Sequence, residues 1–584
     1  MADSSHQCNA RVTQEACLSH SAYTFPPAPT PDAMEWPGTP LGAGNTITRT
    51  KTRTAVHDKA IDRRPGRRDE LVGVALAQIQ RAGGRPVMTH DVIIHGIRVR
   101  ATTNSAHLHD FWVDNWFSPE EWHAVTGIAP PPDPQVTVYA LGEVADQPEA
   151  AYYSRRTDTI VFFNTAYYGQ LKSWVLGAVG RVLAEEYGIH SIHGACVEKD
   201  GRGVLYIAPT GTGKSTSSYG LVAYPRTRFH SDDWVYVRYT HATADGRRIH
   251  PMRIVTAGGE EVRGYRVFRW LEEHGRRATG RVEGLDLENR EVTVPLAALD
   301  LAAPPAAYAF TSEKVYYLRT NLVENFPLSA REMLRSKLEN VPDVSANYLG
   351  EIGPLLDDLE TAIRRDTSRD GAALAAMDVG HLREALARMI AFDNARAMLD
   401  ITRVLPADRV FANPMEPTRL ASVILLKRDR RDPTVLEHLT LARFLGRLLV
   451  GETPERKREI AYNAYRAVDD EAERAYVAAL ERETEEREGE GYPVEALART
   501  FTMRPDVPET LAEEFELFRV MHQACRCYDL NTILTADSVI EDKKTAVLMT
   551  MRVIARLVDT LPAEIHHDLS DYRAFVGAAP GPAR

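Results

Sequence analysis

Alternating apolar and polar positions in the first third of the chain predict short β-strands. The segments with this pattern are Val92–Val99 and Val136–Leu141, and Thr159–Asn164 predicts another strand. A period of two suits a half-buried strand, because successive side chains point to opposite faces of a sheet. From Leu171 apolar residues recur at helical spacing until Gly188, which ends the predicted helix. With a short helix near Leu71, these segments predict a small α/β lead-in domain over residues 71–188.

From about Ser329 onward the apolar positions recur mainly at helical spacing. Examples are the face formed by Leu382, Leu386, Met389 and Ile390, and the segment Val547–Val558. One further apolar run, Ala421–Leu426, precedes the charged Lys427-Arg428-Asp429 and predicts a late strand that returns to a central sheet. We therefore expect a core over residues 189–435 with a helical insertion at about 329–410, followed by a helical C-terminal domain at 436–584.

Residues 1–70 contain neither period and predict a disordered tail. The tail is rich in proline, and residues 49–68 hold eight Lys or Arg side chains against two Asp. Such a composition cannot bury enough apolar surface to offset the entropy of ordering. A solvated tail is the simpler interpretation, and contact with an acidic partner or RNA is the alternative.

Composition narrows the classes of function. The 584 residues suffice for three or four folded units, and the net charge of −11 argues against a general nucleic-acid-binding surface. No apolar run is long enough to span a bilayer, so we expect a cytoplasmic protein without membrane contact. The five cysteines include no C-x-x-C pair for zinc or redox chemistry. Assembly into a homo-oligomer stays open.

The apolar run Gly203–Ile207 leads directly into a glycine-rich segment that matches the phosphate-loop pattern G-x-x-x-x-G-K-[ST], with Ala208 in place of the first glycine. The backbone N–H groups of such a loop, together with the following helix N-terminus, bind phosphate. Lys214 would reach the β- and γ-phosphates, and the Ser215 hydroxyl would bind Mg²⁺. The expected nucleotide-binding residues are Thr210, Gly211, Thr212, Gly213, Lys214, Ser215 and Thr216.

Two acidic residues follow shortly after this loop. Asp232 and Asp233 begin a predicted strand within Phe229–Val237. Beside a bound triphosphate, one carboxylate can hold Mg²⁺ while the other takes a proton from an attacking hydroxyl, and the sequence leaves open which acid does which. An acid pair that caps a loop is the alternative. Upstream, His193 precedes the strand of the phosphate loop, so its imidazole could lie near the same phosphates, although a structural role fits a single histidine equally well.

These segments resemble the HPr kinase and phosphoenolpyruvate carboxykinase superfamily of phosphate-loop enzymes. In that superfamily a His-Gly or His-Cys element, the phosphate loop and an Asp-Asp pair follow in close order, as His193-Gly194, Gly211–Ser215 and Asp232-Asp233 do here. The resemblance implies a phosphate-loop core with a mixed sheet. It also implies that Asp232 is the general base or acid, that Asp233 or Ser215 binds magnesium, and that His193 assists the phosphates or metal.

Two features depart from the family pattern. Carboxykinases carry a Gly-Gly-Cys segment and a lysine after the acid pair, whereas Ala257-Gly258-Gly259-Glu260 lacks both the cysteine and the lysine. The glycine-rich signature with which HPr kinases engage their protein substrate is missing from the Arg-rich segment 246–282. The departures argue against carboxykinase activity and against HPr as the substrate.

Three further groups are candidates outside this core. Arg319 ends a predicted strand and could neutralise phosphate charge as a catalytic residue; a surface arginine is the alternative. The polar-aromatic clusters Tyr462–Arg466 and Cys527–Thr532 could build an acceptor pocket, although helix contacts would explain them as well. The sequence thus predicts an ATP- and Mg²⁺-dependent phosphotransferase that acts on a hydroxyl of a protein, a peptide or a small metabolite. A nucleotide-dependent regulatory ATPase or switch is the alternative.

Overall fold

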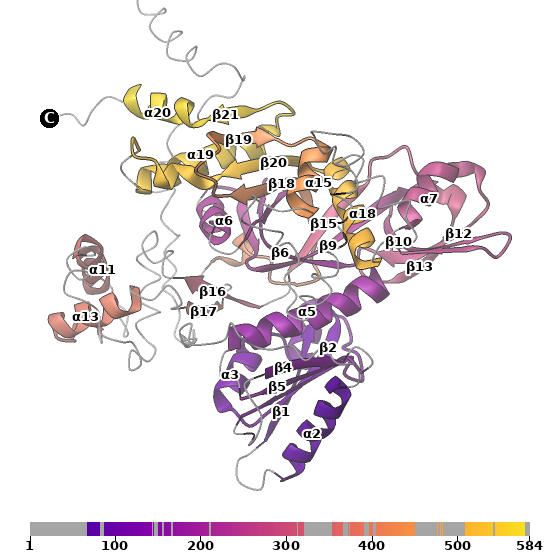
Figure 1. Cartoon of the computed structure of the whole chain (residues 1–584), viewed down its shortest axis with the longest axis horizontal. Helices are drawn as coiled ribbons and strands as arrows, with labels where there is room; N and C mark the ends of the chain where they lie inside the picture. Colours follow the sequence, from indigo (N-terminus) through magenta and orange to yellow (C-terminus); the bar gives the residue numbers. More distant parts are fainter. Residues whose placement is uncertain are drawn as a thin grey trace, which may run out of the picture.

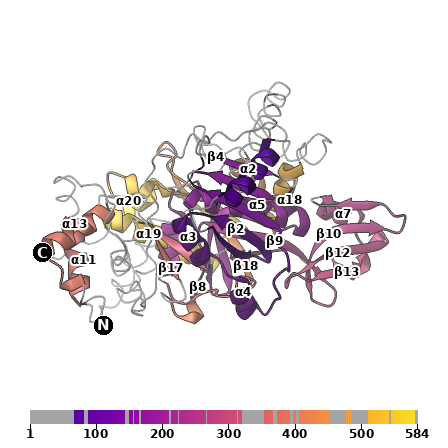
Figure 2. The same cartoon turned by 90° about the horizontal axis from the view of Figure 1, so that it is seen from below.

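The computed structural model has a mixed α/β fold with mixed sheets and several helices. It describes residues 67–81, 87–142, 144, 150–154, 157–164, 168–209, 212–222, 224–264, 266–311, 314–319, 353–365, 372, 374–390, 396–400, 405–449, 476, 479, 482, 509–540 and 543–578. Figure 1 shows a smaller sheet and a larger sheet with helix α5 (Tyr168–Tyr187) between them. Strands β10 and β12 with helix α7 project at one end of the molecule, and helices α11 and α13 lie at the opposite end (Figure 2).

The smaller sheet has five strands in the order β1-β2-β3-β5-β4. Their bounds are Met88–Ile94 (β1), Ile97–Thr103 (β2), Val136–Leu141 (β3), Ala150–Ser154 (β4) and Thr159–Phe163 (β5). The predicted strands at 136–141 and 159–164 are therefore confirmed. The single strand predicted at Val92–Val99 is wrong, because His95 and Gly96 both adopt positive φ and turn the chain into an antiparallel β1–β2 hairpin.

Four helices accompany this sheet. They are α2 (Arg67–Arg81), α3 (Ala106–Asn115), α4 (Pro119–Thr126) and α5. Helix α5 confirms the helix predicted to end at Gly188, and its buried Val175 and Val179 share a core with Trp234 and Tyr236 of the larger sheet. One apolar face thus joins the two sheets through α5.

The N-terminal boundary of the fold lies slightly before the predicted one. Helix α2 begins at Arg67, inside the predicted tail, and its Leu71 and Ala75 are buried against strands β4 and β5. The burial of these two side chains fixes the helix to the sheet. The tail predicted for residues 1–66 lies outside the described residues.

The larger sheet has 14 strands, with a main path β13-β12-β10-β9-β6-β7-β18-β20-β19-β21. Along it, β7 (Arg202–Ile207) pairs in parallel with β18 (Thr418–Lys427), which pairs in parallel with β20 (Arg526–Asn531). Strand β18 confirms the late strand predicted at Ala421–Leu426. The other strands are β6 (His190–Lys199), β8 (Thr227–Ser231), β9 (Trp234–Thr243), β10 (Arg248–Thr256), β11 (Glu261–Arg263), β12 (Gly280–Asp286), β13 (Glu291–Pro295), β14 (Leu299–Asp300), β15 (Ala306–Thr311), β19 (Thr434–His438) and β21 (His566–Asp568).

The C-terminal region is not a purely helical domain beside the core. Its described helices are α15 (Leu441–Leu449), α18 (Glu509–Ala524), α19 (Lys543–Thr560) and α20 (Leu569–Ala578), as the helical spacing predicts. However, β20 and β21 also come from this region and extend the larger sheet. The segment Cys527–Thr532, which contacts between helices also seemed to explain, covers most of β20 and ends at Thr532, the residue after that strand. Pairing with β18 made these buried residues a strand, which their short pattern did not reveal.

In the described part of the expected helical insertion there are both helices and a strand. Helices α11 (Gly353–Arg365) and α13 (Val379–Ile390) carry buried Leu356 and Leu382. Strand β17 (Arg396–Asp400) pairs with β16 (Val315–Arg319) in a separate two-stranded sheet. The remaining two core helices are α6 (Lys214–Val222) and α7 (Arg266–His274). Among the helices that the structure describes, none is both long enough and apolar enough to cross a bilayer.

Four buried histidines predict that the fold is sensitive to acid. Burial lowers the pKa of His95, His230, His241 and His250 to about 3. A folded pKa below the ordinary 6.5 means that the unfolded chain binds the proton first. Stability is therefore complete above pH 6.5 and falls between pH 6.5 and 3, by up to about 1.4 kcal/mol per pH unit for each histidine.

His241→Phe tests this dependence, because His241 is buried and already stacks on Phe268, so a phenyl ring can take its place. We expect the variant to lose less unfolding free energy than the wild type between pH 6.5 and 5, by about 2 kcal/mol at most. Urea denaturation at each pH measures the difference. His381→Gln, at an exposed position, is the control and should follow the wild type; parallel pH curves for all three proteins would contradict the prediction.

Candidate functional site

The phosphate-loop segment lies between a buried strand and a helix, as its pattern predicts. Strand β7 ends at Ile207, and helix α6 begins at Lys214. Gly213 has φ +112°, a conformation that side-chain-bearing residues rarely adopt. Lys214 is buried, and its Nζ donates a hydrogen bond to the Ala208 carbonyl at 2.6 Å. The lysine thus folds back across the loop that it follows. Thr210 and Gly211 lie outside the described residues.

Close packing fixes helix α6 in place. A Cβ at Gly220 would lie 2.2 Å from the Met551 sulfur of α19, so any larger residue would force the Met551 side chain to move. The first intrahelical bond closes from Ser217 N to the Gly213 carbonyl at 2.9 Å. Ser215 and Thr216 lie in the first turn of α6, at the positive end of the helix dipole. The described part of the loop therefore leads directly into the positive end of α6.

Ser215 and Asp232 are brought together across the loop. The Ser215 hydroxyl lies 3.0 and 3.1 Å from the two carboxylate oxygens of Asp232 and donates to them. Asp232 is 8% exposed, so it is one of the few buried carboxylates. Two oxygen-bearing side chains thus converge at the N-terminus of α6, next to Lys214.

The acid pair lies at a break between two strands rather than at the start of one. The strand predicted at Phe229–Val237 is therefore wrong as a continuous element. Strands β8 and β9 both pair with β6, and the chain bends between them at Asp232 and Asp233. Asp233 has φ +83°, a backbone conformation that is strained for a residue other than glycine. The Asp233 carbonyl accepts a bond from Gly194 N at 3.1 Å, and this bond holds the bend in place.

The bend directs Asp233 toward two nitrogen-bearing side chains. His193 Nε2 lies 3.3 Å from Asp233 Oδ1, and Lys172 Nζ lies 3.7 Å from Oδ2. The structure therefore brings His193 to the acid pair, as its position before the loop suggested. The Lys172 side chain is only 3% exposed, whereas that of Asp233 is 29% exposed. A buried lysine beside a carboxylate stabilises the ionised form of that carboxylate.

Sequence reasoning missed Lys172, although a signal was present. Lys172 lies on helix α5 three and four residues before the buried Val175 and Leu176, so it falls on the apolar face. Lysine is almost never fully buried without a partner. A lysine on an apolar helical stripe is therefore a sign of a buried ion pair, although its partner cannot be identified from spacing alone.

A further group comes from the far end of the chain, where the structure brings Thr532, the last residue of the candidate cluster Cys527–Thr532, to the loop together with Arg428, which sequence reasoning missed. Thr532, which follows β20, has its hydroxyl 3.1 Å from the Thr212 carbonyl of the loop. Arg428, which follows β18, donates from Nε to the same hydroxyl at 3.3 Å. Both residues lie at the carboxyl ends of strands parallel to β7. In parallel sheets these ends meet at one edge, where ligands commonly bind.

Other predicted residues are not brought to this site by any described contact. Arg319 does end a strand, but β16 belongs to the separate two-stranded sheet and pairs Arg319 with Arg396. Its side chain lies outside the described residues, as does the cluster Tyr462–Arg466. The segment Ala257–Glu260 forms the turn between β10 and β11. The described contacts therefore favour a site built from the loop, the acid pair, His193 and Lys172.

The donors at the loop suit a magnesium ion bound together with phosphate. Mg²⁺ is usually held by one or two carboxylates, waters and substrate phosphates. The hydroxyl of Ser215 and the carboxylate of Asp232 are oxygen donors that already share one location. Within the described ranges, no cluster of three or more His, Cys, Asp or Glu side chains could hold a metal ion. Neither protein-family models nor curated protein sequences match this chain.

Removing the Lys172 cation is expected to destabilise the fold around Asp233. Lys172→Met keeps the length of the side chain but leaves a partly buried carboxylate without that partner, which typically costs about 1–3 kcal/mol. Urea denaturation measures the loss. In the double variant Lys172→Met/Asp233→Asn the carboxylate charge that paired with Lys172 is also removed. The double variant should therefore be more stable than the sum of the two single changes predicts. Strict additivity would show that the two side chains do not interact.

Proposed function

We propose that this protein binds a nucleoside triphosphate with Mg²⁺ and transfers the γ-phosphoryl group to a hydroxyl acceptor. The observation that carries the proposal is the contact between Ser215 and Asp232 at the N-terminus of α6, directly beside Lys214. A sequence that matched the phosphate-loop motif only by chance would not be expected to have a carboxylate in contact with the hydroxyl of its serine. ATP is the nucleotide that we propose.

The fold supports the same proposal. We extend it to a phosphate-loop core of the HPr kinase and phosphoenolpyruvate carboxykinase type. In support, His193 lies on β6, the loop follows β7, and the acid pair follows β8. Strand β6 pairs with β7, β8 and β9. One strand thus aligns the three motif segments.

Ser215 and Asp232 are the residues that would hold Mg²⁺. The ion would supply charge neutralisation on the phosphates. This changes the expectation from the resemblance, in which Asp232 was the general base or acid and Asp233 or Ser215 a magnesium ligand. The reason is geometric: ligands of one ion must converge, and the described contacts join Asp232, not Asp233, to the Ser215 hydroxyl.

Asp233 is then the residue that receives the proton. Its carboxylate accepts the proton of the acceptor hydroxyl while the hydroxyl oxygen bonds to the γ-phosphorus. The bond from that phosphorus to the β,γ-bridging oxygen breaks, and the diphosphate leaves with its electron pair. Lys172 and His193 hold Asp233 in position before transfer. Lys214 neutralises charge on the phosphates from within the loop.

The experiment that tests the function is label transfer. The purified protein is incubated with γ-labelled ATP, Mg²⁺ and a lysate, and the labelled molecule is isolated. Label on a protein, peptide or small-molecule hydroxyl supports a kinase. Release of labelled inorganic phosphate alone, with no labelled acceptor, would instead favour a regulatory ATPase or switch.

Lys214→Ala is expected to weaken ATP binding about tenfold or more. A hydrogen bond to a charged group contributes about 1.5–3 kcal/mol, and 1.4 kcal/mol is a factor of ten in affinity. Calorimetric titration measures it, with circular dichroism to show that the variant folds. Lys214→Met keeps the apolar stem in its buried place and should show the same loss; unchanged affinity in both variants would exclude the loop as the nucleotide site.

The two acids are expected to separate binding from chemistry. Asp233→Asn should leave ATP affinity within about twofold and lower the transfer rate by about 100-fold to 10,000-fold, the usual contribution of a positioned base. Asp232→Asn should raise the Mg²⁺ concentration needed for half-maximal rate, because it removes the charge of one ligand. Transfer rates and Mg²⁺ titrations on both variants decide the assignment. If the two effects are exchanged, Asp232 is the base; if neither change slows transfer, the proposed chemistry is wrong.

A further inference from the structure

The turn after strand β18 carries a cation toward the phosphate loop that the proposed function does not yet use. Arg428 follows Lys427, the last residue of β18, and its Nε bonds the Thr532 hydroxyl at 3.3 Å. That hydroxyl lies 3.1 Å from the Thr212 carbonyl. The Thr532 methyl carbon is also 3.8 Å from where a Cβ on Gly213 would lie. Arg428 is thus one side chain removed from the loop.

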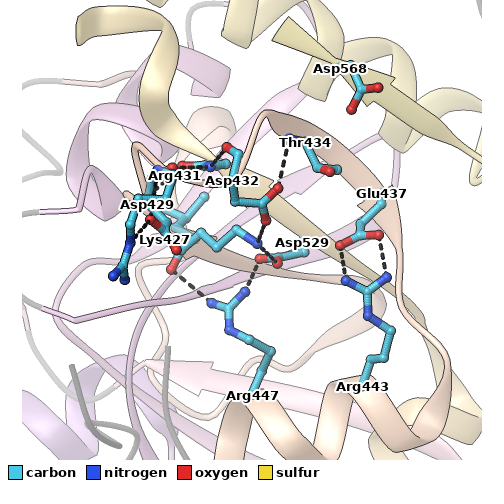
Figure 3. Close-up of polar contacts among 12 residues, drawn as sticks. Lys427, Asp429, Arg431, Asp432, Thr434, Glu437, Arg443, Arg447, Asp529 and Asp568 are labelled. Atoms are coloured by element: carbon cyan, nitrogen blue, oxygen red, sulfur yellow. Dashed lines mark hydrogen bonds and ion pairs between the residues drawn. The ribbon is translucent and has the colours of Figure 1, made fainter. Parts of the chain in front are cut away.

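A buried charge network anchors the strands on either side of this turn. The Lys427 ammonium lies 2.9 Å from Asp529 and 2.6 Å from Asp432, and Arg447 also pairs with Asp529 (Figure 3). Lys427 and Asp529 are 6% and 2% exposed. Charges buried to this extent are tolerated only when they are paired. The network therefore fixes the ends of β18 and β20 relative to each other.

Hydrogen bonds from side chains to the backbone also hold the turn itself rigid. Asn531 accepts a bond from Asp429 N at 3.0 Å and donates to the carbonyls of Asp429 and Asp432 at 2.8 and 3.0 Å. Thr532 Oγ1 is 3.1 Å from the Lys427 carbonyl. Arg428 is therefore flanked in the chain by Lys427 and Asp429, whose backbone groups are held by these hydrogen bonds. Preorganised charge stabilises a bound anion without a cost of reorganisation at the time of binding.

We propose that Arg428 contacts the phosphates of the nucleotide bound in the loop, with Thr532 as its positioning residue. The inference rests on the proposed nucleotide binding and adds to it the cation that Arg319 was expected to supply. A guanidinium has five N–H donors, so it can bond Thr532 and other groups at the same time. Arginine is suited to phosphate because its planar group can make two parallel bonds to oxygen. Arg428 is exposed, which leaves it accessible to a ligand.

The chain provides a matched control two residues away. Arg430 lies in the same turn and is exposed, and the contacts of the described residues include no hydrogen bond or ion pair from it. Arg428→Ala and Arg430→Ala each remove one positive charge, so they change the net charge of the protein equally. Only the first removes a guanidinium that lies next to the loop.

Titration of the full chain with Mg²⁺-ATP by calorimetry tests the inference. We expect Arg428→Ala to lower the affinity about tenfold and Arg430→Ala to change it less than twofold. Arg428→Lys should recover part of the loss, and Thr532→Val should weaken binding while leaving the charge in place. Raising the salt concentration should narrow the difference between wild type and Arg428→Ala, because screening weakens an exposed charge contact.

Three outcomes would overturn it. Equal affinity in Arg428→Ala and wild type would remove Arg428 from the site, while the Lys214 variants would still report on the loop. Equal losses in the Arg428 and Arg430 variants would mean that general surface charge, not contact, attracts the nucleotide. A wild-type protein that binds no ATP would fail the proposed function and this inference together.

Discussion

The parallel pairing of β7, β18 and β20 is the constraint on which the rest of the site depends. It places the carboxyl ends of three strands at one edge of the sheet, although the chain between them is long. Thr532 and Thr212, 320 residues apart, are in contact for this reason. Without that pairing, the phosphate-loop segment would face solvent on the side that β18 and β20 now flank, and Arg428 would have no defined relation to it.

The opposite side of the loop depends on a bend rather than on regular pairing. Strand β6 pairs first with β9 and then with β8, and the chain between those two strands contains the acid pair. The bend separates the tasks of two adjacent residues: Asp232 contacts Ser215, whereas Asp233 contacts His193 and Lys172. On a regular strand, neighbouring side chains would also diverge, but without the positive φ that the fold imposes at Asp233. Strain of this kind persists only where surrounding contacts enforce it.

Charge burial distinguishes this region from an ordinary sheet edge. Lys172, Lys427 and Asp529 are all buried, and each has an oppositely charged partner. Such pairs seldom add much net stability, because desolvation offsets the attraction. Their effect here is on geometry: Lys427 and Asp529 tie two strand ends together, and Lys172 ties helix α5 to the acid pair. Since α5 also shares a core with the smaller sheet, that sheet is mechanically connected to the site.

The local pattern of the sequence determined the strand, loop and helix around Lys214, the strands at 136–141 and 159–164, helix α5 and strand β18. Each of these segments could be predicted because its structure follows from apolar and glycine positions that lie within a few residues of one another. The sequence also placed His193, the loop and the acid pair in one candidate site, because they lie within about 50 residues of one another.

Only the tertiary structure decided the rest. The break at Asp233 and the strand at Cys527–Asn531 depend on pairing with distant strands, which overrides a short local pattern. The hairpin at His95 is instead a local turn, made by two positive φ values that the apolar pattern does not reveal. Lys172, Thr532 and Arg428 reach the site from separate parts of the chain, and their side chains carry no local sign of which residue they will meet. The partner of a buried charge is set by long-range pairing and packing, so the sequence could reveal that such residues need partners, but the fold alone chose them.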